Sequence, residues 1–187
     1  MEELGFFFNP GRCIGCKACQ AACKDRNCLG NNVFFRRADL IVPSGDGLPL
    51  YYSGACNHCQ EPACSQVCPT GAMYMKSDET TVHDSGKCIG CGMCIWSCPY
   101  GAPAFFAQSG RANKCDSCYE LRSEGRQPIC TEACVTGSLM FGDLDEFQKQ
   151  LGSDYKELSS LPRFLPDGSL TNPRLMVKGG RRKLNDE

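Results

Sequence analysis

The 187-residue chain has no long apolar run, and this absence excludes several classes of protein. No stretch approaches the roughly 18 apolar residues that a transmembrane helix needs. Residues 1–8 lack a basic region and are too short for a secretory signal, so we expect no signal peptide. The formal net charge of −1 gives no indication of nucleic-acid binding. We therefore expect neither a direct membrane span nor a nucleic-acid partner.

Recognisable catalytic groups are also missing. The sequence has two histidines, no glycine-rich phosphate loop and no serine–histidine–aspartate arrangement. We therefore predict that the chain is not an enzyme by itself and that substrate chemistry takes place on another protein. A self-contained reductase with an unrecognised site is one alternative, which turnover by the isolated chain would support.

Cysteine, by contrast, is abundant, at seventeen residues. A content of about 9% indicates a cysteine scaffold, built on disulfides, zinc or iron–sulfur clusters. The odd count and the lack of an export signal weaken the disulfide interpretation. Paired CxxC segments often bind zinc, but zinc sites rarely need three cysteines at x2–x2 spacing followed by x3-Cys-Pro. We therefore favour iron–sulfur clusters, and an iron determination on anaerobically purified protein would decide between them.

Sixteen of the cysteines form four motifs, and Cys28 is left over. The first and third motifs follow the C-x2-C-x2-C-x3-C spacing of bacterial ferredoxins. The second contains one four-residue gap, and the fourth has a wide middle gap over residues 119–129. In chain order the motifs are Cys13, Cys16, Cys19 and Cys23; Cys56, Cys59, Cys64 and Cys68; Cys88, Cys91, Cys94 and Cys98; and Cys115, Cys118, Cys130 and Cys134.

The spacing has a geometric reason. A CxxC loop turns back on itself, so its two thiolates and the third cysteine can reach irons of one cubane. The x3 gap then begins a helical turn, whose positions i and i+4 share a face. The fourth thiolate is directed away from its own loop and ligates the other cluster of a pair. Clusters therefore come in pairs, each pair built by two motifs that exchange one cysteine.

The second and third motifs are adjacent, and a predicted hairpin over residues 73–76 and 80–83 joins them. They should form an inner unit, which leaves the first and fourth motifs to form an outer unit. We therefore predict four [4Fe–4S] clusters on four ligand sets. Set 1 is Cys13, Cys16, Cys19 and Cys134; set 2 is Cys115, Cys118, Cys130 and Cys23; set 3 is Cys56, Cys59, Cys64 and Cys98; set 4 is Cys88, Cys91, Cys94 and Cys68.

Near-identical segments at 11–16 and 86–91 indicate a duplicated ferredoxin-like unit. We predict an α+β fold of two interleaved ferredoxin-like units, with short β-hairpins, short helices, long loops and an extended C-terminal tail. Residues 1–54 and 105–150 would form the outer unit and residues 55–104 the inner unit. Residues 151–187 lack cysteine and would form the tail, with disorder expected over residues 179–187.

Basic residues accompany the motifs, at Arg12, Lys17, Lys24, Lys87 and Lys114. Cations beside a negatively charged cluster raise its reduction potential, and ordinary surface charge is the alternative interpretation.

Three other residues stand out near the motifs. We expect Trp96 to pack in the core beside a cluster and His58 to form hydrogen bonds within its loop. Cys28 lies outside the periodic pattern, and we expect it to be an inert free thiol.

Longer segments resemble a known family, the iron–sulfur subunits of the dimethyl-sulfoxide reductase family of molybdopterin oxidoreductases. The similarity includes Cys-Asn-His-Cys-x-x-Pro-x-Cys at 56–64, Cys-Ile-Gly-Cys-Lys-Ala-Cys at 13–19, Cys-Pro-Tyr-Gly-Ala-Pro at 98–103 and Lys-Cys-Asp-Ser-Cys-Tyr at 114–119. It continues through Phe-Gly-Asp-Leu at 141–144 and Leu-Pro-Arg at 161–163.

The resemblance implies an electron-transfer subunit that docks on a large catalytic subunit carrying a molybdenum or tungsten pterin cofactor. It also implies a membrane anchor subunit that exchanges electrons with quinol, and a C-terminal tail that wraps the partner. All sixteen ligand positions are cysteine, so four [4Fe–4S] centres are expected. The complex would be membrane-associated on the extracytoplasmic face, co-exported with a signal-bearing partner, with the cytoplasm as the alternative. A free soluble polyferredoxin is the competing function.

Overall fold

The computed structural model describes residues 3–42, 49–151, 155–157, 166 and 168–178. Short helices and short strands alternate along the chain, and this confirms a small α+β fold. The elements are β1 (Leu4–Phe8), α1 (Ala18–Arg26), β2 (Arg37–Ile41), β3 (Leu50–Gly54), α2 (Ala63–Gln66), β4 (Met73–Met75), β5 (Thr81–His83), α3 (Met93–Ser97), β6 (Ala104–Phe106), β7 (Arg111–Asn113), α4 (Tyr119–Ser123), α5 (Ile129–Glu132), β8 (Leu139–Asp143), α6 (Leu144–Leu151), β9 (Tyr155–Glu157), the 3-10 helix η3 (Gly168–Leu170) and β10 (Leu175–Lys178).

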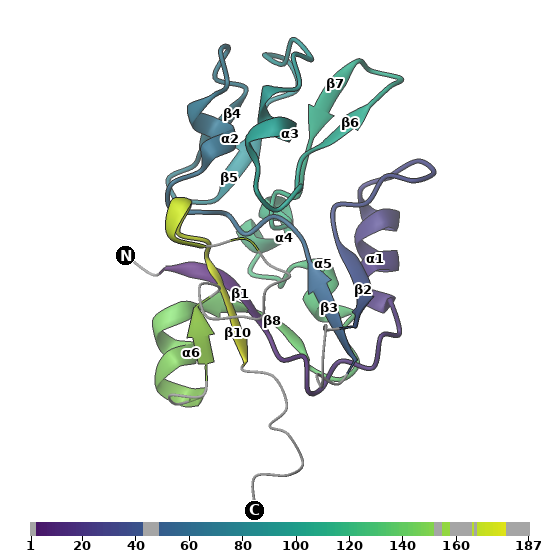
Figure 1. The fold of residues 1–187 in the computed structure, drawn as a ribbon, viewed down its shortest axis with the longest axis vertical. Helices are drawn as coiled ribbons and strands as arrows, with labels where there is room; N and C mark the ends of the chain where they lie inside the picture. The colour runs from purple at the N-terminus through teal and green to yellow at the C-terminus, as the bar shows by residue number, and fades with distance from the viewer. Residues whose placement is uncertain (1–2, 43–48, 152–154, 158–165, 167, 179–187) are drawn as a thin grey trace, which may run out of the picture.

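A four-stranded sheet in the order β8-β1-β10-β9 lies in the lower part of Figure 1. β1 is antiparallel to β8, with Phe6 opposite Phe141, and parallel to β10, with Phe6 opposite Leu175. β10 is antiparallel to β9. The sheet therefore joins the N-terminal strand, the strand after the fourth motif and the C-terminal strand.

The phenylalanines of β1 are buried on both faces of this sheet. Successive side chains of a strand point to opposite faces. Phe6 and Phe8 accordingly pack with Leu139 in one apolar cluster, while Phe7 contacts Phe147 of α6, with ring centroids 5.7 Å apart. A sequence of bulky aromatic residues thus holds the sheet between α6 and the cysteine-rich interior.

The upper part of Figure 1 contains α2, α3 and two of the antiparallel hairpins, β4–β5 and β6–β7. Met73 lies opposite His83 in β4–β5, which confirms the hairpin predicted at that place. The β6–β7 hairpin begins at the end of the predicted inner unit and lies with α2 and α3, since Ala112 packs with Cys64 and Cys94 in one apolar cluster. A third hairpin, β2–β3, lies lower, beside α1.

Each motif places its third cysteine on a short helix, as the x3 spacing predicts. These cysteines are Cys19 on α1, Cys64 on α2, Cys94 on α3 and Cys130 on α5. Within the described residues, no helix combines the length and the apolar character needed to cross a membrane.

The C-terminal segment is partly built into the chain's own fold. β10 occupies an interior position of the four-stranded sheet, and Arg174 precedes it with a side chain only 5% exposed. Its guanidinium donates to the carbonyl oxygens of His58 (3.0 Å) and Glu79 (2.9 Å). The expected disorder of residues 179–187 concerns a segment outside the described residues.

Candidate iron–sulfur centres

Set 3 borders an apolar hollow between the second motif and the end of α3. Cys56, Cys59, Cys64 and Cys98 all line this space, whose empty volume is about 350 Å³, part of it open to solvent. Burial raises the pKa of Cys64 to about 12; the thiol of Cys56 adds to the rise, and the ammonium of Lys114 opposes it. The structure thus brings Cys98 of the third motif to three cysteines of the second.

Set 4 borders a second hollow, whose empty volume of about 310 Å³ is partly open to solvent. Its lining includes Cys68, Cys88, Cys91 and Cys94. Burial raises the pKa of Cys94, and repulsion from Cys88, Cys68 and Cys91 raises it further. Cys68, the last cysteine of the second motif, therefore lies with the third motif. The two motifs exchange their fourth cysteines in space.

Set 2 combines the fourth motif with the last cysteine of the first. Burial raises the pKa of Cys23 to about 12, with further contributions from Cys130 and Cys118. Burial also raises the pKa of Cys115 well above its ordinary value, and Cys23 contributes to that rise.

Set 1 combines the first three cysteines of the first motif with the last cysteine of the fourth. Burial raises the pKa of Cys13, and the thiols of Cys19 and Cys134 act on it in the same direction. Cys16 lies exposed in the loop between Cys13 and Cys19. The structure therefore groups Cys134 of the fourth motif with the first motif.

These groupings suit a cluster of several irons better than a single metal ion. Within the described part of the chain, no three His, Cys, Asp or Glu side chains converge closely enough to share one metal ion. The thiols of sets 3 and 4 instead border a hollow. Iron binds thiolate, so cluster assembly must displace the protons that burial holds on these sulfurs.

Two of the exchanged cysteines share one local environment. The Sγ of Cys68 accepts a hydrogen bond from the Met73 N–H, and the Sγ of Cys134 accepts one from the Leu139 N–H, both at 3.4 Å. For each sulfur, partial burial raises the pKa, but this and other hydrogen bonds outweigh it and lower the pKa overall. Backbone N–H donors of this kind stabilise a thiolate and the negative charge of a cluster.

The basic residues that accompany the motifs differ in their exposure to solvent. Arg12, Lys17 and Lys87 are exposed, as the surface-charge interpretation expects. Lys114 is only 2% exposed, and its Nζ donates to the carbonyl oxygens of Thr81 and Cys115. Lys114 is therefore a buried cation among the ligand sets.

Arg36 is a second buried cation, which the cysteine motifs did not predict. It is 2% exposed, and attraction to Cys130, Cys115 and other thiols outweighs the effect of burial and raises its pKa. Arg36 is far along the chain from either neighbouring motif, so motif spacing carries no signal for it.

The structure tests the expectations for Trp96, His58 and Cys28. Trp96 is 89% exposed, so the prediction that it packs in the core is wrong. His58 is buried, but neither ring nitrogen has a hydrogen-bond partner within the described structure, so its predicted role is also wrong. Its ring instead lies 6.4 Å from that of Phe6. Cys28 is an exposed thiol outside all four sets.

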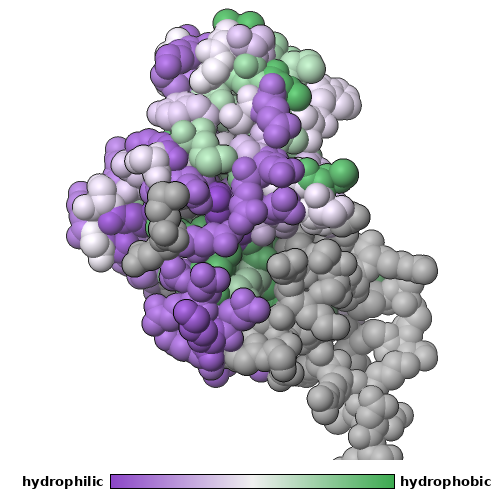
Figure 2. Space-filling view, turned by 90° about the vertical axis from the view of Figure 1, so that its left-hand side faces the viewer, coloured by the Kyte–Doolittle hydropathy of each residue, from purple (hydrophilic) through white to green (hydrophobic). Residues whose placement is uncertain are grey.

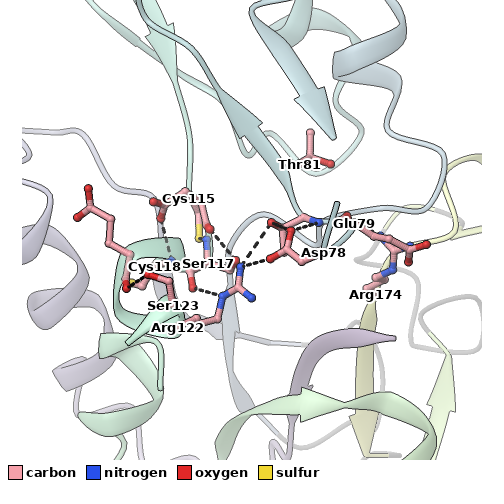
Figure 3. Close-up of polar contacts among 12 residues, drawn as sticks. Asp78, Glu79, Thr81, Cys115, Ser117, Cys118, Arg122, Ser123 and Arg174 are labelled. Atoms are coloured by element: carbon pink, nitrogen blue, oxygen red, sulfur yellow. Dashed lines mark hydrogen bonds and ion pairs between the residues drawn. The ribbon is translucent and has the colours of Figure 1, made fainter. Parts of the chain in front are cut away.

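Ion pairs connect the part of the molecule that holds sets 3 and 4 to the rest. Figure 3 shows the Arg122 side chain of α4 directed at Asp78, in the turn between β4 and β5. The nitrogen–oxygen distance is 2.8 Å, and the Arg122 Nε also donates to the Ser117 carbonyl at 3.0 Å. Arg174 reaches Glu79 of the same turn. Both contacts anchor this hairpin turn, and that of Arg122 ties it to the loop that carries Cys115 and Cys118.

Comparison with known proteins identifies iron–sulfur domains over the segments that contain the four motifs. Residues 49–144 match the model of a 4Fe-4S dicluster domain, and residues 10–26 match a 4Fe-4S binding domain. Together the two matches include every cysteine of the four sets.

Curated relatives extend the similarity over nearly the whole chain. The chain is 41% identical to the B subunit of anaerobic dimethyl sulfoxide reductase of Escherichia coli over 186 residues, covering 94% of this chain and 88% of the relative. It is 41% identical to the Haemophilus influenzae protein of the same name, covering 95% and 90%. The B subunit of polysulfide reductase of Wolinella succinogenes is 31% identical, covering 97% and 96%. The protein therefore belongs to the family of electron-transferring [4Fe–4S] subunits found in dimethyl sulfoxide reductase and related enzymes.

Proposed function

We propose that this chain conducts electrons through four [4Fe–4S] clusters held by the sixteen cysteines of sets 1 to 4. The observation that carries the proposal is the exchange of the fourth cysteine between motifs. Each set consists of three cysteines of one motif and the last cysteine of another, which is the ligand pattern of two-cluster ferredoxins. Sets 1 and 2 then form an outer unit and sets 3 and 4 an inner unit, interleaved in sequence.

Packing of the thiols supports a linear order of the clusters. Cys130 of set 2 packs in an apolar cluster that also contacts Cys134 of set 1. A second apolar cluster joins Cys115 of set 2 to Cys56 of set 3, and a third joins Cys64 of set 3 to Cys94 of set 4. Electrons would pass one at a time between sets 1, 2, 3 and 4 in this order.

Exposed apolar side chains lie beside both ends of this chain of clusters. Trp96 and Ile89 flank cysteines of set 4 and are 89% and 68% exposed. Ile14 and Val135 flank cysteines of set 1 and are 63% and 77% exposed. Figure 2 shows hydrophobic side chains at the upper end of the molecule, the end that contains α2 and α3. Exposed apolar groups of this kind favour protein contacts at the two ends.

The partners follow from the family. One end would dock on a large catalytic subunit with a molybdenum or tungsten pterin cofactor, and the other on a membrane anchor subunit. Oxidation of one quinol at the anchor releases two protons there, and its two electrons pass singly through the clusters to the substrate. The complex would be membrane-associated on the extracytoplasmic face after co-export with a signal-bearing partner, or alternatively cytoplasmic.

The domain organisation is part of the proposal. Residues 1–54 and 105–150 would form the outer unit and residues 55–104 the inner unit, with the β6–β7 hairpin packed against the inner unit through Ala112. Residues 151–187 would form a tail that contributes β10 before it reaches the partner. Because β10 pairs with β1 over Phe6 to Phe8, the tail would leave this chain from a fixed point on its own sheet.

Iron content and co-purification test the proposal. Anaerobically purified chain should contain about sixteen irons, four for each cluster. It should also be recovered in a tight stoichiometric complex with a large pterin-containing protein. Recovery only as a soluble monomer with all clusters bound would refute the subunit role and support a polyferredoxin.

Single replacements test the ligands. Cys94→Ser should remove or alter one EPR signal, that of set 4, while Cys28→Ser should leave all four clusters intact. Equal damage from the two variants would refute the assignment of sixteen ligands and one free thiol.

A further inference from the structure

Arg36 is a buried cation that contacts no carboxylate in the part of the chain that the structure describes. Its Nη1 donates to the Ser53 carbonyl at 3.1 Å and to the Ser53 hydroxyl at 3.3 Å, and its guanidinium lies 4.6 Å from the centroid of the Phe6 ring. Among the described residues it forms no ion pair, and its Nε and Nη2 have no hydrogen-bond partner. A buried cation is costly unless a counter-charge lies nearby.

Cysteines of two different sets surround the guanidinium, and a cluster bound on them would supply this counter-charge. Burial lowers the pKa of Arg36, but attraction to Cys130, Cys115, Cys19 and Cys23 outweighs it. Cys19 belongs to set 1 and the other three to set 2. The Ser53 hydroxyl that Arg36 contacts also lies 3.4 Å from the Sγ of Cys19. Arg36 therefore lies at the junction between sets 1 and 2.

Lys114 occupies the corresponding position at the next junction. It lines the hollow of set 3, and its Nζ donates to the carbonyl oxygen of Cys115 in set 2 at 3.0 Å. Its side chain is buried, and its Nζ also donates to the carbonyl oxygen of Thr81. The same charge thus acts on thiols of sets 2 and 3.

We propose that Arg36 and Lys114 are shared counter-cations, each of which raises the reduction potentials of the two clusters beside it. Each reduction adds one negative charge to a cluster, and a buried cation stabilises that charge because little water screens it. A cation shared by two neighbouring clusters raises both reduction potentials. It therefore changes the difference between the two potentials less than it changes either potential. This inference rests on the four-cluster assignment above.

The proposal predicts a distinct pattern of shifts for each variant. Arg36→Gln should lower the potentials of sets 1 and 2, and Lys114→Gln those of sets 2 and 3. Set 2 responds to both variants and set 4 to neither. We expect at least a tenfold change in the oxidised-to-reduced ratio at a given potential, which is about 59 mV for a one-electron couple.

The chain offers two matched controls. Arg37 is the next residue after Arg36 but is exposed, and Lys87 directly precedes Cys88 as Lys114 precedes Cys115 but is also exposed. Arg37→Gln and Lys87→Gln remove the same charge from water-screened positions. They should therefore leave all four potentials nearly unchanged.

The measurement is a redox titration of the intact complex, followed by EPR. Each signal is assigned with one ligand variant per set, namely Cys16→Ser, Cys118→Ser, Cys59→Ser and Cys91→Ser. Shifts of equal size in all four clusters, or shifts matched by the exposed controls, would overturn the proposal. So would unmoved potentials in a Gln variant that keeps its full iron.

A conservative variant covers the case in which Arg36→Gln loses iron. Arg36→Lys keeps the charge but not the guanidinium geometry, so it should retain iron and potentials close to those of the native chain. A fall in potentials with Lys as large as with Gln, or loss of iron with both, would overturn the role of charge. Fewer than four clusters in the native chain would instead refute the function proposed above.

Discussion

Gly90→Ala should release the third motif from the hairpin that packs against it. Gly90 lies in the loop between Cys88 and Cys91, with φ of +75°. A Cβ added at this position would lie 2.0 Å from the carbonyl oxygen of Gly110, in the turn between β6 and β7. The backbone of the CxxC loop therefore packs directly against the backbone of the hairpin turn. A methyl group at Gly90 would force the two apart.

Comparison with Gly92 divides the expected stability loss of Gly90→Ala into two contributions. It has the same φ of +75°, but an added Cβ would meet nothing within 4 Å. Gly92→Ala should therefore cost only the left-handed conformation, about 1–2 kcal/mol. Gly90→Ala has the same cost and in addition must displace a backbone carbonyl. We expect a total of roughly 3 kcal/mol or more, within the range of strongly destabilising substitutions.

Guanidinium titration of the anaerobically purified chain measures both variants through loss of cluster absorbance. Gly92→Ala should keep full iron with a modestly lower midpoint. Gly90→Ala should have a much lower midpoint and should lose the EPR signal of set 4 first, because its loop carries Cys88 and Cys91. Equal midpoints for the two variants would show that the hairpin does not hold this loop, and would refute the reasoning.

Three further predictions concern contacts around the clusters. Arg174→Met should cost about 3 kcal/mol, because it leaves the Glu79 carboxylate and two carbonyls without their buried cation. Asp78→Ala should cost about 1–2 kcal/mol by removing a charged hydrogen bond to Arg122, whose side chain is 10% exposed. Both are measured as lower guanidinium midpoints of the cluster-loaded chain. Trp96→Ala should change stability by less than about 0.5 kcal/mol, since the side chain is 89% exposed, but should weaken recovery of the partner proteins in co-purification.

An exposed ion pair provides the control for the two charge variants. Arg126 pairs with Glu132 at 3.0 Å, with side chains 50% and 33% exposed. Arg126→Met should cost less than about 1 kcal/mol, as surface pairs usually do. A loss for Arg174→Met no greater than this would contradict the structural role of the buried arginine. A large stability loss for Trp96→Ala would contradict its assignment to the surface.

The sequence by itself determined the local parts of this protein. The spacing within each motif predicted the short helices that carry Cys19 or Cys94, because a CxxC loop and an x3 gap are set by backbone geometry over a few residues. The β4–β5 hairpin was likewise predicted from a few consecutive residues, because a hairpin turn is also a local feature of the backbone. The structure brings cysteines of different motifs close together. Which cysteines bind each cluster remains a prediction that iron analysis and the serine variants test.

Only the tertiary structure decided features that depend on residues distant in sequence. The parallel pairing of β1 with β10 joins Phe6 to Leu175 across nearly the whole chain, and no local pattern encodes such a register. Solvent exposure is likewise a property of the assembled surface, so Trp96 lies outside although it is flanked by two cysteines of the third motif. The surroundings of Arg36 are decided in the same way. A charge acts through space on whatever the fold brings near it, and its electrostatic neighbours are not its neighbours in sequence.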